Sequence, residues 1–317
     1  MNEITVDPRP LAATRSFDTI PFAVLVDEAW RSTRAWARAI LLPAAVLLAP
    51  AALVVQVLVG MWNMSLVGMD AARFDFTRFC GTMAIGLGAL LLVGVYFMVV
   101  YGCIMVSAFR ALDHGQPSLR EALRFYVRPR VWVTDILLAR VLIGLGYCAC
   151  ILPGLFLSAA WSLRLPIMLR EDRFGWDALT RSWQLLTHNP SRQLLRHPLL
   201  KVLLLFVLGA VLGYAVSMVV QMPALVANQV MMMRAMTRGE ALDPQALVRA
   251  TLWLSIPAGV LAALAQLAVQ LYVDFATAHL YLDQVRRKEG RDLGEALDEL
   301  LGAGGSVPAP FPPPGPG

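Results

Sequence analysis

The chain has 317 residues, of which 58% are hydrophobic and 15% are charged, and its mean hydropathy is +0.61. These values exclude a soluble globular domain and predict an integral membrane protein, because so apolar a chain needs lipid as its solvent. The formal net charge is +5. Membrane proteins gather arginine and lysine in cytoplasmic loops for topological reasons, so this charge does not indicate a nucleic-acid partner.

The first 38 residues contain acidic residues and arginines throughout. They lack the apolar core and the small-residue cleavage site of a secretory signal. We expect residues 1–38 to form a cytoplasmic segment with an amphipathic helix at the membrane surface, from Val26 to Trp36. The first membrane span would then be its own insertion signal.

Long runs without Asp, Glu, Lys or Arg follow along the chain. Each exceeds the roughly 20 residues that a helix needs to cross about 30 Å of hydrocarbon. Residues 131–170 are long enough for two spans. The sequence therefore predicts an all-α membrane domain over residues 39–280, with six transmembrane helices at about 39–62, 80–109, 131–151, 154–170, 202–230 and 248–274.

Pro153 and Gly154 lie between the third and fourth predicted spans. Proline cannot continue the helical hydrogen bonds and glycine tolerates a tight turn, so the pair predicts the external turn between these spans. Two crossings here place 20 basic residues on the side of both termini and 5 on the other, whereas one crossing gives 13 and 12. The positive-inside rule therefore favours two crossings and cytoplasmic termini. A re-entrant hairpin gives the same count and stays an alternative.

Two arginines, Arg140 and Arg164, fall inside the third and fourth predicted spans. In one interpretation both side chains extend to the cytoplasmic headgroups, and Asp135 helps to neutralise Arg140. In the other, an anionic ligand or lipid headgroup is held between the two arginines in a polar cavity facing the cytoplasm. The candidate anion- or lipid-binding residues are therefore Arg140, Arg164 and Asp135.

Basic amphipathic segments also precede the third and fifth spans. Ser118 and Glu121 predict a capping box at the start of the first segment. In the second, tryptophans and leucines recur at helical spacing on one face. We expect both segments to lie at the inner headgroup surface, with Trp176, Arg181 and Trp183 contacting lipid. The alternative is that such segments accompany any membrane span and have no further role.

The sequence contains no P-loop, no HExxH, no GxSxG and no dinucleotide-binding glycine motif, so it predicts no enzyme, no catalytic residue and no cofactor. The four cysteines lie in or beside apolar runs without nearby histidines, which predicts no metal site. Asp274, His279 and Asp283 are spaced five and four residues apart, which does not place all three on one helical face. We interpret them as part of a hydrated interfacial helix.

The last residues divide into two predicted cytoplasmic segments. Residues 281–301 combine arginine, lysine and acidic residues and predict a basic helix. Residues 302–317 are too rich in proline and glycine to pack and predict a disordered tail.

Two stretches carry a resemblance to a known family. Their most specific residues are Ala178, Leu179, Arg181, Ser182 and Trp183 in the first, and Tyr281, Asp283, Arg287, Lys288, Glu289, Gly290, Asp292 and Leu293 in the second. Over about residues 20–295 the chain resembles the bacterial family related to the membrane domain of glycerophosphoryl diester phosphodiesterases. The resemblance implies a six-span fold in the cytoplasmic membrane and, for most members, no established activity. The chain has no room for the roughly 250-residue TIM barrel that would carry hydrolysis. Leu282 and Val285 also stand where the family usually has tyrosine and arginine.

We therefore expect a non-enzymatic protein of the bacterial inner membrane that binds lipid or a membrane partner and serves envelope or membrane homeostasis. The partners would be membrane lipids, with another membrane protein or a second copy of the chain as a further class. The competing hypothesis is a small transporter or permease component, in which Arg140 and Arg164 line the path of an anionic substrate.

Overall fold

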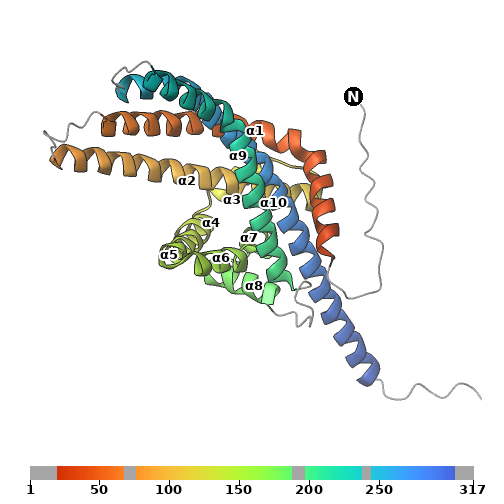
Figure 1. Cartoon of the computed structure of the whole chain (residues 1–317). Helices are drawn as coiled ribbons and strands as arrows, with labels where there is room; N and C mark the ends of the chain where they lie inside the picture. Colours follow the sequence, from red (N-terminus) through yellow and green to blue (C-terminus); the bar gives the residue numbers. More distant parts are fainter. Residues whose placement is uncertain (1–19, 68–75, 188–196, 238–243, 304–317) are drawn as a thin grey trace, which may run out of the picture.

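The computed structural model describes residues 20–67, 76–187, 197–237 and 244–303, and within these ranges the elements are helices without any strand (Figure 1). Six helical segments are long and apolar enough to cross a membrane: Phe22–Gly60, Met83–His114, Pro129–Ala149, Ile151–Arg170, Pro198–Met231 and Ser255–Arg287. The chain is therefore a multi-pass helical membrane protein, and the predicted number of spans is confirmed.

Four long helices form the frame of the molecule. They are α1 (Phe22–Val67), α2 (Phe76–His114), α9 (Pro198–Thr237) and α10 (Pro244–Ala303). The shortest, α2, has 39 residues. At about 1.5 Å per residue it is ~58 Å long, nearly twice the hydrocarbon thickness. Helix α10 packs against α1, α9 and α2 and so joins the frame (Figure 1).

Residues 26–36 form part of α1 rather than a separate surface helix. The sequence from Phe22 to Leu42 contains no proline or glycine that would end a helix. Pro43 and Pro50 lie further along inside α1, and Figure 1 shows this helix changing direction along its length. Prolines inside a helix are the common cause of such bends.

Between α2 and α9 the chain is divided into short elements. They are α3 (Leu119–Tyr126), α4 (Pro129–Trp132), the π-helix η2 (Val133–Arg140), α5 (Val141–Ala149), α6 (Ile151–Ala160), α7 (Arg164–Arg170) and α8 (Trp176–Thr187). The third span joins α4, η2 and α5, and the fourth joins α6 and α7. Both middle spans are therefore irregular, whereas the spans of the frame are continuous α-helices.

Helices α5 and α6 form a closely packed hairpin whose connection is Cys150. The backbone of Cys150 is extended, with φ −171° and ψ 152°. The expected turn residues lie just after it, because Pro153 and Gly154 belong to the first turn of α6, where proline needs no N–H partner. Gly154 has a packing role instead, since a Cβ there would overlap the ring of Tyr147.

The buried core lies where α1, α2, α7 and α10 pack against one another. Phe109 of α2 and Tyr281 of α10 form an edge-to-face ring pair with centroids 5.5 Å apart. Ile104, Met168 and Phe275 are fully buried in the same cluster. This core holds the broken fourth span against the frame, which fixes the position of the polar residues described next.

Candidate functional site

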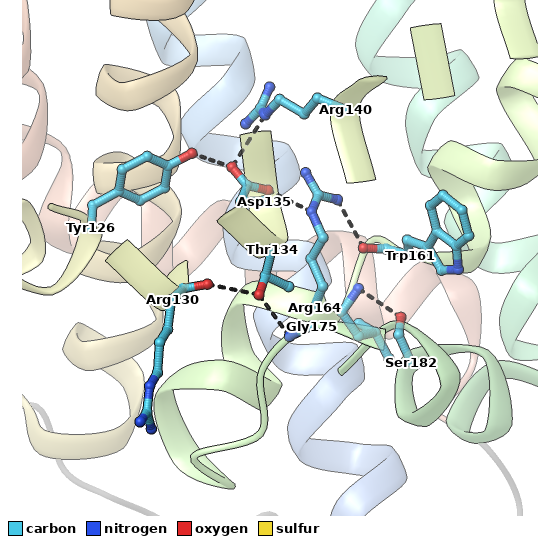
Figure 2. A network of polar contacts seen from close by, with 10 residues as sticks. Tyr126, Arg130, Thr134, Asp135, Arg140, Trp161, Arg164, Gly175 and Ser182 are labelled. Carbon is cyan, nitrogen blue, oxygen red and sulfur yellow. Dashed lines mark hydrogen bonds and ion pairs between the residues drawn. The ribbon is translucent and has the colours of Figure 1, made fainter. Parts of the chain in front are cut away.

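A buried carboxylate organises the polar residues of the two irregular spans (Figure 2). Asp135 of η2 has no exposed surface. Its Oδ2 accepts hydrogen bonds from the hydroxyl of Tyr126 and from Nε of Arg140, the latter at 3.2 Å, and its Oδ1 accepts from Nε of Arg164 at 2.5 Å. We call these four residues the Asp135 cluster.

The π-helical register brings Asp135 and Arg140 together. In a π-helix each N–H bonds to the carbonyl five residues before it and the turn is wider, so side chains five apart point in more similar directions than in an α-helix. In an α-helix, at 100° per residue, the same two side chains would point about 140° apart. Short π-helical turns occur often at functional sites. The predicted pairing of Asp135 with Arg140 is therefore present, and it depends on this register.

Arg164 reaches the cluster from a break in the fourth span. Helix α6 ends at Ala160 and α7 begins at Arg164, so the backbone carbonyls at the break need partners. Nη1 of Arg164 donates to the carbonyl of Trp161 at 2.8 Å. The hydroxyl of Ser182 donates to the carbonyl of Ala160 at 2.7 Å and accepts from the backbone N–H of Leu163 at 3.3 Å. These side chains satisfy the break inside the protein.

The loop before α8 is tied to the same region. Gly175 has φ +65°, a conformation that glycine adopts without strain. Its backbone N–H donates to the hydroxyl of Thr134 at 2.7 Å, and that hydroxyl donates to the carbonyl of Arg130 at 2.7 Å. The π-helix, the fourth span and α8 therefore form one connected polar unit, which Figure 2 shows from close by.

Tyr126 lies on α3, outside the membrane spans, and is fully buried. Burial, followed by the neighbouring Asp135 carboxylate, raises the pKa of Tyr126 well above its ordinary value of 10.0. The phenol therefore stays protonated and donates its hydrogen to Asp135. Its ring fits against Gly102 of α2, where a Cβ would overlap the ring atoms.

The charges of the Asp135 cluster do not balance. Arg140 and Arg164 are both cationic, and the two guanidinium groups share one carboxylate. Their side chains are 24% and 11% exposed. Nε of Arg140 donates to Asp135, and Nε and Nη1 of Arg164 donate to Asp135 and to the carbonyl of Trp161. The cluster therefore carries one net positive charge and still has hydrogen-bond donors available.

These donors border a cavity of about 410 Å³ between the helices. Arg140 and Arg164 line it together with residues of α2, α5, α6, α9 and α10. Its volume falls within the range of roughly 300–1,000 Å³ that is typical of small-molecule sites. Arg140 and Arg164 therefore line one cavity together, whereas Asp135 does not line it.

Asp274 lines the same cavity, a position that the sequence analysis did not predict. It is 5% exposed, and its Oδ1 accepts from the amide nitrogen of Gln270 at 2.8 Å. Its Oδ2 and the hydroxyl of Ser162 are buried without a hydrogen-bond partner among the described residues. The signal that could have been used is a carboxylate one α-helical turn after Gln270 at the end of a long apolar run.

His279 and Asp283, which follow Asp274 on α10, make contacts of their own away from it. His279 shares a hydrogen bond of 2.9 Å with the hydroxyl of Ser32 on α1. Asp283 accepts from Nε of Arg287, one turn further along α10, at 2.9 Å. No group of metal-ligating side chains occurs in the part of the chain that the structure describes.

The predicted lipid-contacting residues of α8 divide into two kinds. Trp176 and Trp183 are 60% and 38% exposed, which leaves both indole rings available to lipid. The side chain of Arg181 is 14% exposed, and its Nε donates to Glu171 at 3.0 Å. The hydroxyl of Tyr281 also donates to Glu171, at 3.2 Å. Arg181 thus links α8 to α7 and α10.

No protein-family model, curated protein sequence or solved structure matches the chain. The resemblance to the membrane family therefore stays a hypothesis from the sequence. Within the residues that carried it, Arg181, Ser182 and Tyr281 make the contacts that hold α6, α7 and α8 together.

Proposed function

We propose that the chain is a non-enzymatic protein of the bacterial cytoplasmic membrane that binds the phosphate of a lipid headgroup and so serves membrane homeostasis. One observation carries this proposal: two arginines that share a single carboxylate line a cavity between the spans. A phosphate accepts several charge-assisted hydrogen bonds at once, and arginine donates in a geometry that fits it. Beside the two arginines, the net positive charge of the Asp135 cluster favours an anionic group over a neutral one.

The binding test uses the purified full chain in detergent, with native mass spectrometry to count bound lipids. We expect phosphatidylglycerol and phosphatidylethanolamine to bind more tightly than diacylglycerol, which lacks the phosphate. Arg140→Gln should weaken the two phospholipids about tenfold or more, because a hydrogen bond from a charged donor is worth about 1.5–3 kcal/mol. The matched control is Arg173→Gln, since Arg173 pairs with Glu171 outside the cavity. Equal affinity of Arg140→Gln and the unchanged chain for phospholipids would refute the proposal.

We further propose that both termini are cytoplasmic and that α3 and α8 lie at the inner headgroup surface. The distribution of basic residues and the exposed tryptophans of α8 support this orientation. Cys150 is exposed at the α5–α6 turn and serves as a natural probe once Cys80, Cys103 and Cys148 are replaced. A membrane-impermeant maleimide should label Cys150 in intact cells. Asp177→Cys, in a background that also lacks Cys150, should be labelled only in opened cells. The reverse pattern would overturn the orientation.

The second candidate is a transporter component for an anionic substrate. The π-helix and the break between α6 and α7 favour it, because interrupted helices beside a cavity are typical of transporter binding sites. Arg140→Cys in a chain without its native cysteines distinguishes the two functions. Labelling by a small polar reagent from both membrane sides supports transport, and labelling from the cytoplasm alone supports lipid binding.

A further inference from the structure

The cavity lining combines groups of opposite chemical character. We call the guanidinium groups of Arg140 and Arg164 its arginine wall and the carboxyl of Asp274 on α10 its Asp274 wall. The protein satisfies Asp135 fully but leaves Oδ2 of Asp274 buried without a hydrogen-bond partner in the described part of the chain. A buried acceptor without a donor costs free energy, so Asp274 is expected to have its partner in the ligand.

A simple anion fits only half of this site. Its oxygens would accept from the arginines but would face the carboxylate of Asp274 across the cavity. A simple cation would pair with Asp274 but would face two guanidinium groups. A ligand with both charges satisfies both walls. The buried hydroxyl of Ser162, which lines the cavity and has no described partner, is a further donor for the anionic end.

We propose that the cavity binds a zwitterion, with its phosphate on the arginine wall and a primary ammonium donating to Oδ2 of Asp274. The shared chemistry is that of phosphoethanolamine, which exists as a lipid headgroup and as a small soluble phosphodiester. A primary ammonium has the N–H groups that Oδ2 requires, whereas a quaternary ammonium has none. This inference rests on the proposed phosphate-binding function and assigns its specificity.

The first experiment compares lipids on the unchanged full chain in detergent by native mass spectrometry. We expect phosphatidylethanolamine to bind about tenfold more tightly than both phosphatidylglycerol and phosphatidylcholine, since only it offers a phosphate and an N–H donor together. Soluble glycerophosphoethanolamine is added as a competitor. Competition at an affinity equal to that of the lipid identifies a soluble zwitterion as the ligand, and its failure identifies the lipid. Equal binding of the three phospholipids overturns the inference.

The second experiment replaces the carboxyl group of Asp274 by an amide. Asp274→Asn should bring phosphatidylethanolamine and phosphatidylglycerol within about twofold of each other while both still bind. Asp283→Asn is the matched control, because Asp283 lies on the same helix and pairs with Arg287 outside the cavity, and it should leave the preference unchanged. Ser162→Ala should weaken both lipids alike.

The two proposals fail in different ways. An unchanged preference in a folded Asp274→Asn variant overturns the zwitterion inference and leaves phosphate binding intact. If the unchanged chain binds phospholipids and diacylglycerol with equal affinity, phosphate binding itself is overturned. The lipid comparison needs no variant, so it decides the inference even where Asp274→Asn does not fold.

Discussion

The frame helices and the two middle spans differ in the regularity of their backbone. Helices α1, α2, α9 and α10 are continuous α-helices over 39 to 60 residues. The third and fourth spans change register at η2 and break before Arg164. Side chains from neighbouring elements then have to complete their hydrogen bonds. The irregular spans are the ones that bring Asp135, Arg140 and Arg164 together.

This difference has an energetic side. An apolar side chain on a frame helix contacts lipid tails or another apolar helix with nearly the same free energy, because both surroundings are apolar. A charged group in the middle spans depends on a few specific partners, and their loss leaves a charge in a poorly solvated place. Substitutions should therefore have large effects in the middle spans and small effects on the lipid face of the frame.

The largest effect is expected for Asp135→Leu, which removes the carboxylate shared by Arg140 and Arg164. Breaking a buried ion pair from one side costs about 3–5 kcal/mol. The purified variant should unfold at a clearly lower temperature or denaturant concentration. Replacing Arg140 and Arg164 by methionine in the same variant should recover much of the loss, since the unpaired charges are then gone. A stable single variant would contradict the role of Asp135 as their counter-ion.

Tyr126→Phe should cost about 1.5–3 kcal/mol at neutral pH, because a buried hydrogen bond to a charged carboxylate is lost. The raised pKa of Tyr126 adds a pH dependence. Its contribution is complete below the ordinary tyrosine pKa of 10.0 and declines as the pH rises above that value, since only the unfolded chain ionises freely. The stability gap between the two proteins should therefore narrow above pH 10 in unfolding curves.

Gly102→Ala should destabilise the chain by about 1–3 kcal/mol, because the new methyl group overlaps the ring of Tyr126 and overpacks the site. Gly88→Ala on the same helix is the control, since nothing lies near its added Cβ. Thermal unfolding of the two variants in detergent measures the difference. Equal stability would show that Tyr126 moves aside without cost.

The smallest effect is expected on the lipid face of the frame. Leu92 of α2 is 76% exposed in the protein, and Leu92→Ala should change the stability by less than about 0.5 kcal/mol. The unfolding midpoint should match that of the unchanged chain. A loss as large as that of Gly102→Ala would mean that this face of α2 packs against another protein in the membrane.

The architecture was accessible from the sequence because it depends on length and charge. A run without charged residues and longer than the bilayer predicts a span whatever its details, and all six predicted spans have counterparts among the helices. The turn was placed at Pro153 and Gly154 because both residues break helices. Proline is also common in the first turn of a helix. In the structure Pro153 lies in the first turn of α6, and Cys150 connects α5 to α6.

The details of the site were less accessible. The sequence VTDILLAR contains no signal that separates a π-helix from an α-helix. The sequence alone therefore does not explain how Asp135 and Arg140, five residues apart, come to face each other. The sequence places Asp274 in a hydrated interfacial helix with His279 and Asp283, and this interpretation is wrong for Asp274, which is buried. Its contribution to the cavity depends on the packing of α10 against elements more than a hundred residues away, which single-sequence periodicity does not report.

The π-helix gives the site a tolerance to the loss of one residue. A π-helical turn equals an α-helical turn with one additional residue, so deleting a single codon between Asp135 and Arg140 would restore an ordinary α-helix. The two residues would then be four apart, a spacing that places both side chains on the same face of an α-helix. Six spans would remain. A reading frame shortened by three nucleotides at this place would thus keep the membrane topology and the pairing of Asp135 with Arg140.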